Sequence, residues 1–251
     1  MNLLAVETTG PFASVALINE KKEYREIRFG KELSHLQSLI PMIEELLREC
    51  GLNTGQLTHI AASHGPGSFT GIRIGISTAR ALAQALSLPV ISVPTLASFV
   101  WNEPNHSGLF CPVFDARREQ IYSGAYARNE EGIRTLVEAG AYSLEDYLAK
   151  VEAADPLHEK DILLFGDGLK LYGPAIQEWG KSTGRISSTG EGRIREAAAD
   201  RLYQRASSVA LAAYALWEKN EILEFHQLEP VYLRKAEAQR KLEERLAMEK
   251  A

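Results

Sequence analysis

The chain has 251 residues, of which 45% are hydrophobic and 24% are charged, and its formal net charge is −5. This composition is typical of a globular protein long enough to bury one large core or two smaller ones. The negative net charge argues against a protein that holds nucleic acid by itself. It leaves open a subunit of a complex whose basic surface lies elsewhere.

The sequence gives no sign of a membrane segment or of export. No apolar run reaches the roughly 18 residues of a membrane span, and the N-terminal residues lack the pattern of a signal peptide. Cys50 and Cys111 lie far apart and form no CxxC motif, so we expect reduced, inert thiols. We therefore expect a cytoplasmic protein with no membrane partner.

The first half of the chain predicts three strands, followed by helices that alternate with further strands. Short polar connections between the first three strands favour an antiparallel start, and the intervening helices favour parallel pairing afterwards. The predicted elements are strands at 3–6, 13–18 and 23–29, a helix at 33–50, a strand at 58–63, a helix at 69–86, a strand at 88–93 and a helix at 95–101.

The second half repeats this order after the turn-rich segment 102–108 (NEPNHSG), which we take as a lobe boundary. We expect a first lobe over 1–101, a second over 102–235 and a charged helical tail over 236–251. In the second lobe the predicted elements are strands at 109–115, 120–126 and 133–138, a helix at 144–153, a strand at 161–165, a helix at 169–179, a loop at 180–192 and a helix at 203–218.

The segment Ala61–Leu86 combines an apolar run, a Gly-Pro-Gly turn and a helix with small residues at every fourth position. These small residues are Gly71, Gly75, Ala79 and Ala83. Such a column lets another backbone approach closely, at a cost in helix propensity. A turn that leads into a helix can also direct backbone N–H groups at an anion. A plain tight turn and an anion site both fit this pattern.

The familiar cofactor and catalytic motifs are absent from the sequence. None of the six histidines has metal-ligand spacing, and the glycines after Gly65 do not match the dinucleotide fingerprint. The segment Ala175–Ser182 resembles a phosphate-binding loop, but it falls within a predicted helix. Asp115 and Arg117 lie at a strand end, where charged residues can reach a cleft or another chain, and an Asp–Arg pair next to a turn is more often structural. We therefore predict no catalytic residue, no metal and no cofactor.

Four segments resemble the TsaB (YeaZ) family, a bacterial subunit of the tRNA threonylcarbamoyladenosine machinery. They are LLAVETTG, HGPGSFTGIRIG, PVISVPTLASF and VFDARREQIYSGAY, all within the first 126 residues, and GDGLKLYG and PVYLRKAE follow later. The resemblance implies an α/β, actin-like (ASKHA) fold of two ribonuclease-H-like lobes, with mixed sheets flanked by helices.

The resemblance also implies a non-catalytic partner that binds and activates the TsaD transferase, whose own helical HxxxH metal motif is missing here. A TsaE-type ATPase would join a ternary complex, and tRNA would bind only through the complex. Because apolar helices left exposed in a purified protein tend to self-associate, we expect the isolated chain to form a homodimer through the face that docks the partner. We expect the partner to dock on the first two predicted helices, at Leu36, Leu39, Ile40, Ile43, Leu47, Gly71, Ile72, Gly75, Ile76 and Ala79.

The alternative interpretation is an ATP-dependent phosphotransferase of the same fold. Kinases with this fold hold nucleotide phosphates and a metal in the first hairpin, where this chain has a Glu in place of the common Asp. The residues that would surround the phosphates are Glu7, Thr8, Thr9, Gly65, Gly67, Ser68 and Thr70.

Overall fold

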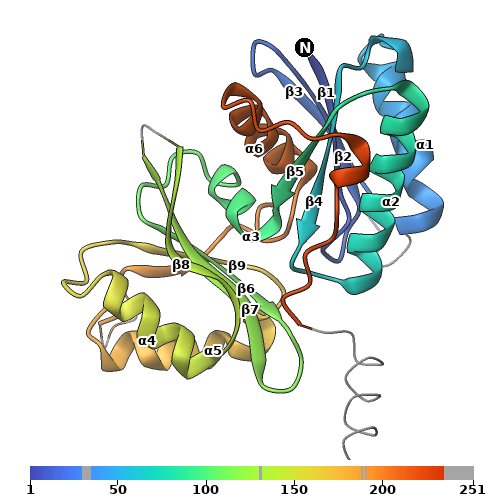
Figure 1. Ribbon diagram of the computed structural model, residues 1–251. Coiled ribbons are helices and arrows are strands. Elements are labelled where there is room, and N and C mark those ends of the chain that lie inside the picture. The colour runs from blue at the N-terminus through green and yellow to red at the C-terminus, as the bar shows by residue number, and fades with distance from the viewer. Residues whose placement is uncertain (30–34, 130–131, 188, 190, 235–251) are drawn as a thin grey trace, which may run out of the picture.

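The computed structural model describes residues 1–29, 35–129, 132–187, 189 and 191–234. They form two lobes, and each lobe is built on a five-stranded sheet (Figure 1). In the first lobe the strand order is β3-β2-β1-β4-β5. Its strands are β1 (Asn2–Glu7), β2 (Ser14–Asn19), β3 (Tyr24–Arg28), β4 (His59–Gly65) and β5 (Val90–Pro94).

The second lobe has the strand order β10-β9-β6-β7-β8. Its strands are β6 (Leu109–Asp115), β7 (Gln120–Asn129), β8 (Gly132–Ser143), β9 (Ile162–Phe165) and β10 (Ile194–Glu196). In both sheets the first strand pairs antiparallel with the second and parallel with the fourth. The two sheets therefore share one topology, and the predicted fold of two lobes with mixed sheets is confirmed.

Helices cover both faces of each sheet. In the first lobe α1 (His35–Glu49) and α2 (Phe69–Leu86) lie on the outer face, and α6 (Ala206–Glu218) packs on the inner face (Figure 1). In the second lobe α4 (Leu144–Ala154) and α5 (Leu169–Ser182) lie outside. The inner face of that sheet contacts α3 (Thr95–Ser98) and the short helix η2 (Phe99–Trp101). The remaining short helices are η1 (Thr54–Gln56) and η3 (Phe225–Gln227).

The chain does not divide into lobes at single points, as the ranges 1–101 and 102–235 predicted. Helix α6 comes from the second half of the chain but packs on β1, β2 and β5 of the first lobe. Leu228 is also fully buried in the first-lobe core. Conversely, Phe99 of the first half packs on Phe110 and Phe165 of the second sheet. The predicted tail at 236–251 lies outside the described residues.

Several predicted elements differ from the structure. The helix predicted over 203–218 begins at Ala206, and the strand predicted over 133–138 extends over Gly132–Ser143. Helix α5 continues to Ser182, into the segment predicted as a loop. Strand β10 was not predicted, because only one of its three residues, Ile194, is buried, and so short an apolar signal has no readable period. Among the described residues, no helix combines the length and apolar character needed to cross a bilayer.

Candidate functional site

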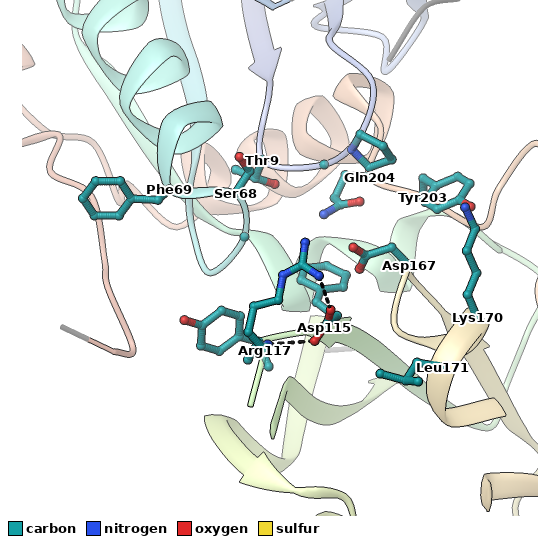
Figure 2. A pocket seen from close by; sticks show the side chains of 16 residues that line it. Thr9, Ser68, Phe69, Asp115, Arg117, Asp167, Lys170, Leu171, Tyr203 and Gln204 are labelled. Carbon is teal, nitrogen blue, oxygen red and sulfur yellow. Dashed lines mark hydrogen bonds and ion pairs between the residues drawn. The ribbon is translucent and has the colours of Figure 1, made fainter. Parts of the chain in front are cut away.

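A cavity of ≈690 Å³ lies between the two lobes (Figure 2). The first lobe contributes the turn after β1 and the turn before α2, and the second lobe contributes the ends of β6 and β9. The lining residues are Thr9, Gly10, Pro11, Gly67, Ser68, Phe69, Phe114, Asp115, Ala116, Arg117, Tyr122, Asp167, Lys170, Leu171, Tyr203 and Gln204.

The two first-lobe turns are bonded to each other. The Ser68 backbone N–H donates to the Thr9 carbonyl oxygen at 2.8 Å, and the Thr8 hydroxyl donates to the Gly71 carbonyl oxygen at 2.7 Å. The Ser68 hydroxyl then caps α2 by accepting from the Gly71 N–H at 3.2 Å. A Cβ at Gly67 would lie 2.6 Å from the Thr9 carbonyl oxygen, so only glycine fits there. The Ser68 N–H and the hydroxyls of Thr8 and Ser68 are therefore engaged within the lobe.

Glu7 is enclosed behind these turns and does not line the cavity. Its side chain is fully buried, and its carboxylate accepts hydrogen bonds from the Thr9 N–H, from the Thr9 hydroxyl at 2.6 Å and from the Ser63 hydroxyl. Burial raises the pKa of Glu7, and these hydrogen bonds oppose the rise in part. Glu7 is therefore a satisfied core carboxyl rather than a cation ligand facing the cleft.

The second-lobe wall carries two carboxylates at the ends of parallel strands. Asp115 ends β6 and Asp167 follows β9, so both reach the same edge of the sheet. Burial raises the pKa of Asp167, while a hydrogen bond from the Asp115 backbone N–H lowers it. Asp115 forms an ion pair with Arg117 at 3.0 Å, and Lys170 lies on the same wall. This wall is polar, charged and open to the cavity.

The turn between β6 and β7 has an unusual backbone. Arg117, Arg118 and Glu119 have φ angles of 61°, 55° and 59°, in the left-handed region that side chains rarely adopt. The Asp115 carboxylate accepts from the Arg117 N–H at 2.7 Å, and the Gln120 N–H donates to the Arg117 carbonyl oxygen at 3.2 Å. These bonds hold the turn in place and direct Arg117 toward the cavity.

Gln204 closes the side of the cavity where the lobes are connected. Its side chain is 5% exposed and points into the cavity (Figure 2). Sequence reasoning missed Gln204, Asp167 and Lys170 as site residues. The glycine-flanked Asp167 after the apolar run DILLF was a signal that could have identified it as a site residue. Gln204 fell at the start of the helix predicted over 203–218 and carried no site signal.

The predicted phosphate-binding residues meet around the two first-lobe turns, but only some of them face the cavity. Thr9, Gly67 and Ser68 line the cavity. Glu7, Thr8, Gly65 and Thr70 do not line it. Within the described residues, no group of three or more His, Cys, Asp or Glu is arranged to bind a metal.

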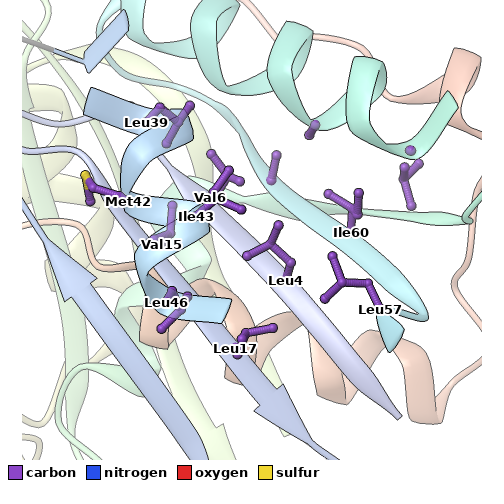
Figure 3. Close-up of a cluster of buried hydrophobic side chains, with 14 of the residues drawn as sticks. Leu4, Val6, Val15, Leu17, Leu39, Met42, Ile43, Leu46, Leu57 and Ile60 are labelled. Carbon is purple, nitrogen blue, oxygen red and sulfur yellow. The ribbon is translucent and has the colours of Figure 1, made fainter. Parts of the chain in front are cut away.

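The predicted partner-binding residues lie mainly in the core, and their expected exposure is wrong (Figure 3). The helices α1 and α2 use their apolar stripes to cover their own sheet. A Cβ on Gly71 or Gly75 would overlap Thr8, so the glycine column admits the turn after β1. The side-chain surroundings of Leu36 lie outside what the structure describes. The buried residues are Leu39, Ile43, Leu47, Gly71, Ile72, Gly75, Ile76 and Ala79.

Ile40 is the one described residue of that predicted set that is exposed, at 44%. A second column of α2, two positions away from the glycine column, points outward and consists of Arg73, Ser77, Ala81 and Ala85. Three of these four side chains are short, which leaves a smooth outer ridge on α2. The outer face of α1 and α2 therefore remains a candidate interaction surface, with different residues from those predicted.

Comparison with known proteins agrees with this architecture. The model of the family described as TsaD, tRNA N6-adenosine threonylcarbamoyltransferase, matches residues 32–242. The tRNA threonylcarbamoyladenosine biosynthesis protein TsaB of Escherichia coli is 30% identical over 96% of this chain and 98% of its own length. TsaB of Bacillus subtilis is 29% identical over 96% and 97%. The structure of YeaZ from Pseudomonas aeruginosa superposes with a TM-score of 0.71 at 27% identity, covering 92% of this chain and 99% of that one.

The two matching sheets and the cavity between them define a two-lobed protein of the actin-like (ASKHA) class. Within that class, the near full-length match to the E. coli protein is decisive. The chain belongs to the TsaB (YeaZ) family.

Proposed function

We propose that this chain is a non-catalytic partner subunit in the biosynthesis of tRNA N6-threonylcarbamoyladenosine. In this proposal it binds a TsaD-type transferase and holds it in an active form. Family membership supports the pathway, because the relatives reported above are named for it. In the same proposal a TsaE-type ATPase joins a ternary complex, tRNA binds only through the complex, and the isolated chain forms a homodimer.

The enclosure of Glu7 is the observation that carries the non-catalytic part of the proposal. A phosphotransferase needs a carboxylate and free N–H donors in the first hairpin to hold phosphates and a metal. Here the Glu7 carboxylate accepts from the Thr9 N–H, the Thr9 hydroxyl and the Ser63 hydroxyl, so the carboxylate and one N–H of the first hairpin are bonded to each other. The phosphotransferase alternative therefore lacks its central residue.

The outer face of α1 and α2 is the docking surface in this proposal. Ile40 provides an exposed apolar side chain on α1. On α2, the short side chains of Ser77, Ala81 and Ala85 permit close contact with a helix of the partner. A homodimer of the isolated chain would use the same face, since a surface that is free without its partner is available to a second copy.

Co-expression with a TsaD-type transferase tests this surface. We expect Ala81→Arg to lose co-purification of the transferase, because a long charged side chain replaces a methyl group on the ridge. Leu157→Arg is the matched control. Leu157 is 76% exposed and follows α4 in the second lobe, whereas the ridge lies on α2 of the first lobe. This variant should retain the transferase.

Both variants should melt at the temperature of the unchanged chain, since both side chains point to solvent. Co-purification that survives in Ala81→Arg, or that is lost in both variants, would refute the proposed surface. Loss in Ala81→Arg alone, with an unchanged melting temperature, supports it.

A further inference from the structure

Two connections between the lobes lie together at one side of the cavity. One follows β5 and contains Asn102, and the other precedes α6 and contains Tyr203. The Asn102 side-chain amide donates to the carbonyl oxygens of Arg201 at 2.7 Å and Tyr203 at 3.0 Å. Asn102 is 4% exposed, so this junction is buried. A pair of connections bonded at one point forms a hinge, about which the lobes can open and close.

A third connection runs between the lobes on the other side of the cavity, and we call residues 229–234 the strap. It follows η3 and runs beside the N-terminal end of α2 (Figure 1). The Val231 N–H donates to the His64 carbonyl oxygen at 2.8 Å. The Tyr232 ring packs on Phe69 at 4.8 Å, and its hydroxyl accepts from Arg73 Nε at 3.0 Å. Three neighbouring contacts therefore fasten the strap to the first lobe.

The strap ends on the second lobe through Arg234. Its Nη1 donates to the carbonyl oxygens of Ala116 at 2.8 Å and Arg117 at 3.3 Å. Ala116 directly precedes the left-handed turn at 117–119 and Arg117 begins it, and both residues line the cavity. One cationic group shared by two backbone oxygens binds the turn without using any of its side chains. The strap thus reaches the wall of the cavity from outside.

We propose that the strap is a conformational latch that holds the two lobes at one opening. A hinge alone leaves one rotation free, and a second tether at the opposite edge removes it. The latch ties the outer surface of α2, at Phe69 and Arg73, to the turn that carries Arg117 into the cavity. This assignment is independent of the proposed partner, because it concerns contacts within one chain.

Electron–electron distance measurements on the full chain test the latch. Spin labels at Lys21→Cys and Ala149→Cys report one exposed position in each lobe. Cys50→Ser removes the half-buried thiol, and Cys111 stays unlabelled because it is buried and burial raises its pKa to about 12. Dilution with unlabelled protein restricts the signal to distances within one chain.

We expect a single narrow distance for the labelled parent protein. Arg234→Ala should give a broader distribution with a longer mean, and Tyr232→Ala should change it in the same direction by loosening the other end of the strap. Arg25→Ala is the matched control, because it removes an exposed ion pair with Glu49 inside the first lobe. This control should leave the distribution unchanged.

The two strap variants keep the test decisive. Distributions for Arg234→Ala and Tyr232→Ala that both coincide with the parent distribution would overturn the latch. A change that Arg25→Ala reproduces would also overturn it, because the effect would then come from general loosening of the first lobe.

Discussion

The two lobes place equivalent strand ends and turns around the cavity. The carboxylate at the strand end is buried in one lobe and lines the cavity in the other. Glu7 ends the first strand of one sheet, and Asp115 ends the first strand of the other. Each is followed by a turn, and each lies beside a glycine-containing turn that leads into a helix. Glu7 is fully buried and bonded to three groups of its own lobe, whereas Asp115 lines the cavity and pairs with the exposed Arg117.

The difference shows that two lobes with the same topology can differ in whether the carboxylate that ends the first strand is accessible from the cavity. In the first lobe Thr8 and Thr9 bond the turn before α2, and Gly67 and Gly71 leave room for them. In the second lobe the left-handed turn at 117–119 projects outward and leaves Asp115 at the cavity. Side chains and glycines in the turns, rather than strand order, decide solvent access.

Gly71→Ala should have the largest effect on stability, because it disrupts the packing of the turn after β1 against the turn before α2. A Cβ at this position overlaps the Thr8 carbonyl oxygen, a backbone atom that cannot rotate away. We expect a loss of about 3 kcal/mol in the free energy of unfolding, measured by urea denaturation. Gly75→Leu would likewise disrupt the fold, so neither variant can probe a partner surface.

Ser77→Ala is the control for Gly71→Ala. It lies on the same helix but points to solvent, so we expect a change within about 0.5 kcal/mol. Equal stability of Gly71→Ala and the unchanged chain would contradict the close approach of the two turns.

Glu7→Gln should change how stability depends on pH. The pKa of Glu7 is raised by burial, so the folded state keeps a proton that the unfolded state releases. Its contribution is therefore complete below the unfolded pKa and is lost as the pH rises toward the folded pKa. The resulting fall in the free energy of unfolding with rising pH has a slope of at most about 1.4 kcal/mol per pH unit. Glu7→Gln removes this part of the pH dependence.

Thermal melting between pH 5 and pH 8 measures this difference. Glu45→Gln, which alters an exposed carboxyl of α1, should keep the parent profile. A Glu7→Gln profile as steep as that of the parent would show that Glu7 is already ionised in the folded protein.

Thr9→Val in the first-lobe turns and Arg117→Ala in the second-lobe turn should have the smallest effects on stability, and these two effects should differ. Thr9→Val removes a hydroxyl donor from the buried Glu7 carboxylate, and we expect a loss of about 1 kcal/mol in chemical denaturation. Arg117→Ala removes an ion pair whose arginine is 86% exposed, and we expect less than about 0.5 kcal/mol. The reverse order would mean that the second-lobe turn at Arg117 stabilises the fold more than the bonded first-lobe turns do.

The fold was largely predictable from the sequence, because apolar periodicity and repeated element order survive in both halves. Which helix faces lie in the core and which face solvent was not predictable. Spacing identified the Gly71–Ala83 column as a close-packing surface, but it cannot say whether the approaching backbone belongs to the same chain. The structure assigns that role to the turn at Thr8.

The candidate site was only partly predictable for a related reason. Asp115 and Arg117 stand beside a readable strand end. Asp167 meets them only through the parallel pairing of β6 with β9, and Gln204 lies just before α6, at a position that the sequence predicted as helix. The open wall of the cavity is thus assembled from segments that no local pattern links.

Calorimetric titration of the full chain with Mg-ATP tests most directly the claim that the Glu7 carboxylate is closed off from the cavity and the chain is not a phosphotransferase. We expect no saturable heat at nucleotide concentrations up to about 1 mM, which corresponds to binding weaker than about −4 kcal/mol. Saturable binding below that concentration that is lost in Glu7→Gln would contradict it.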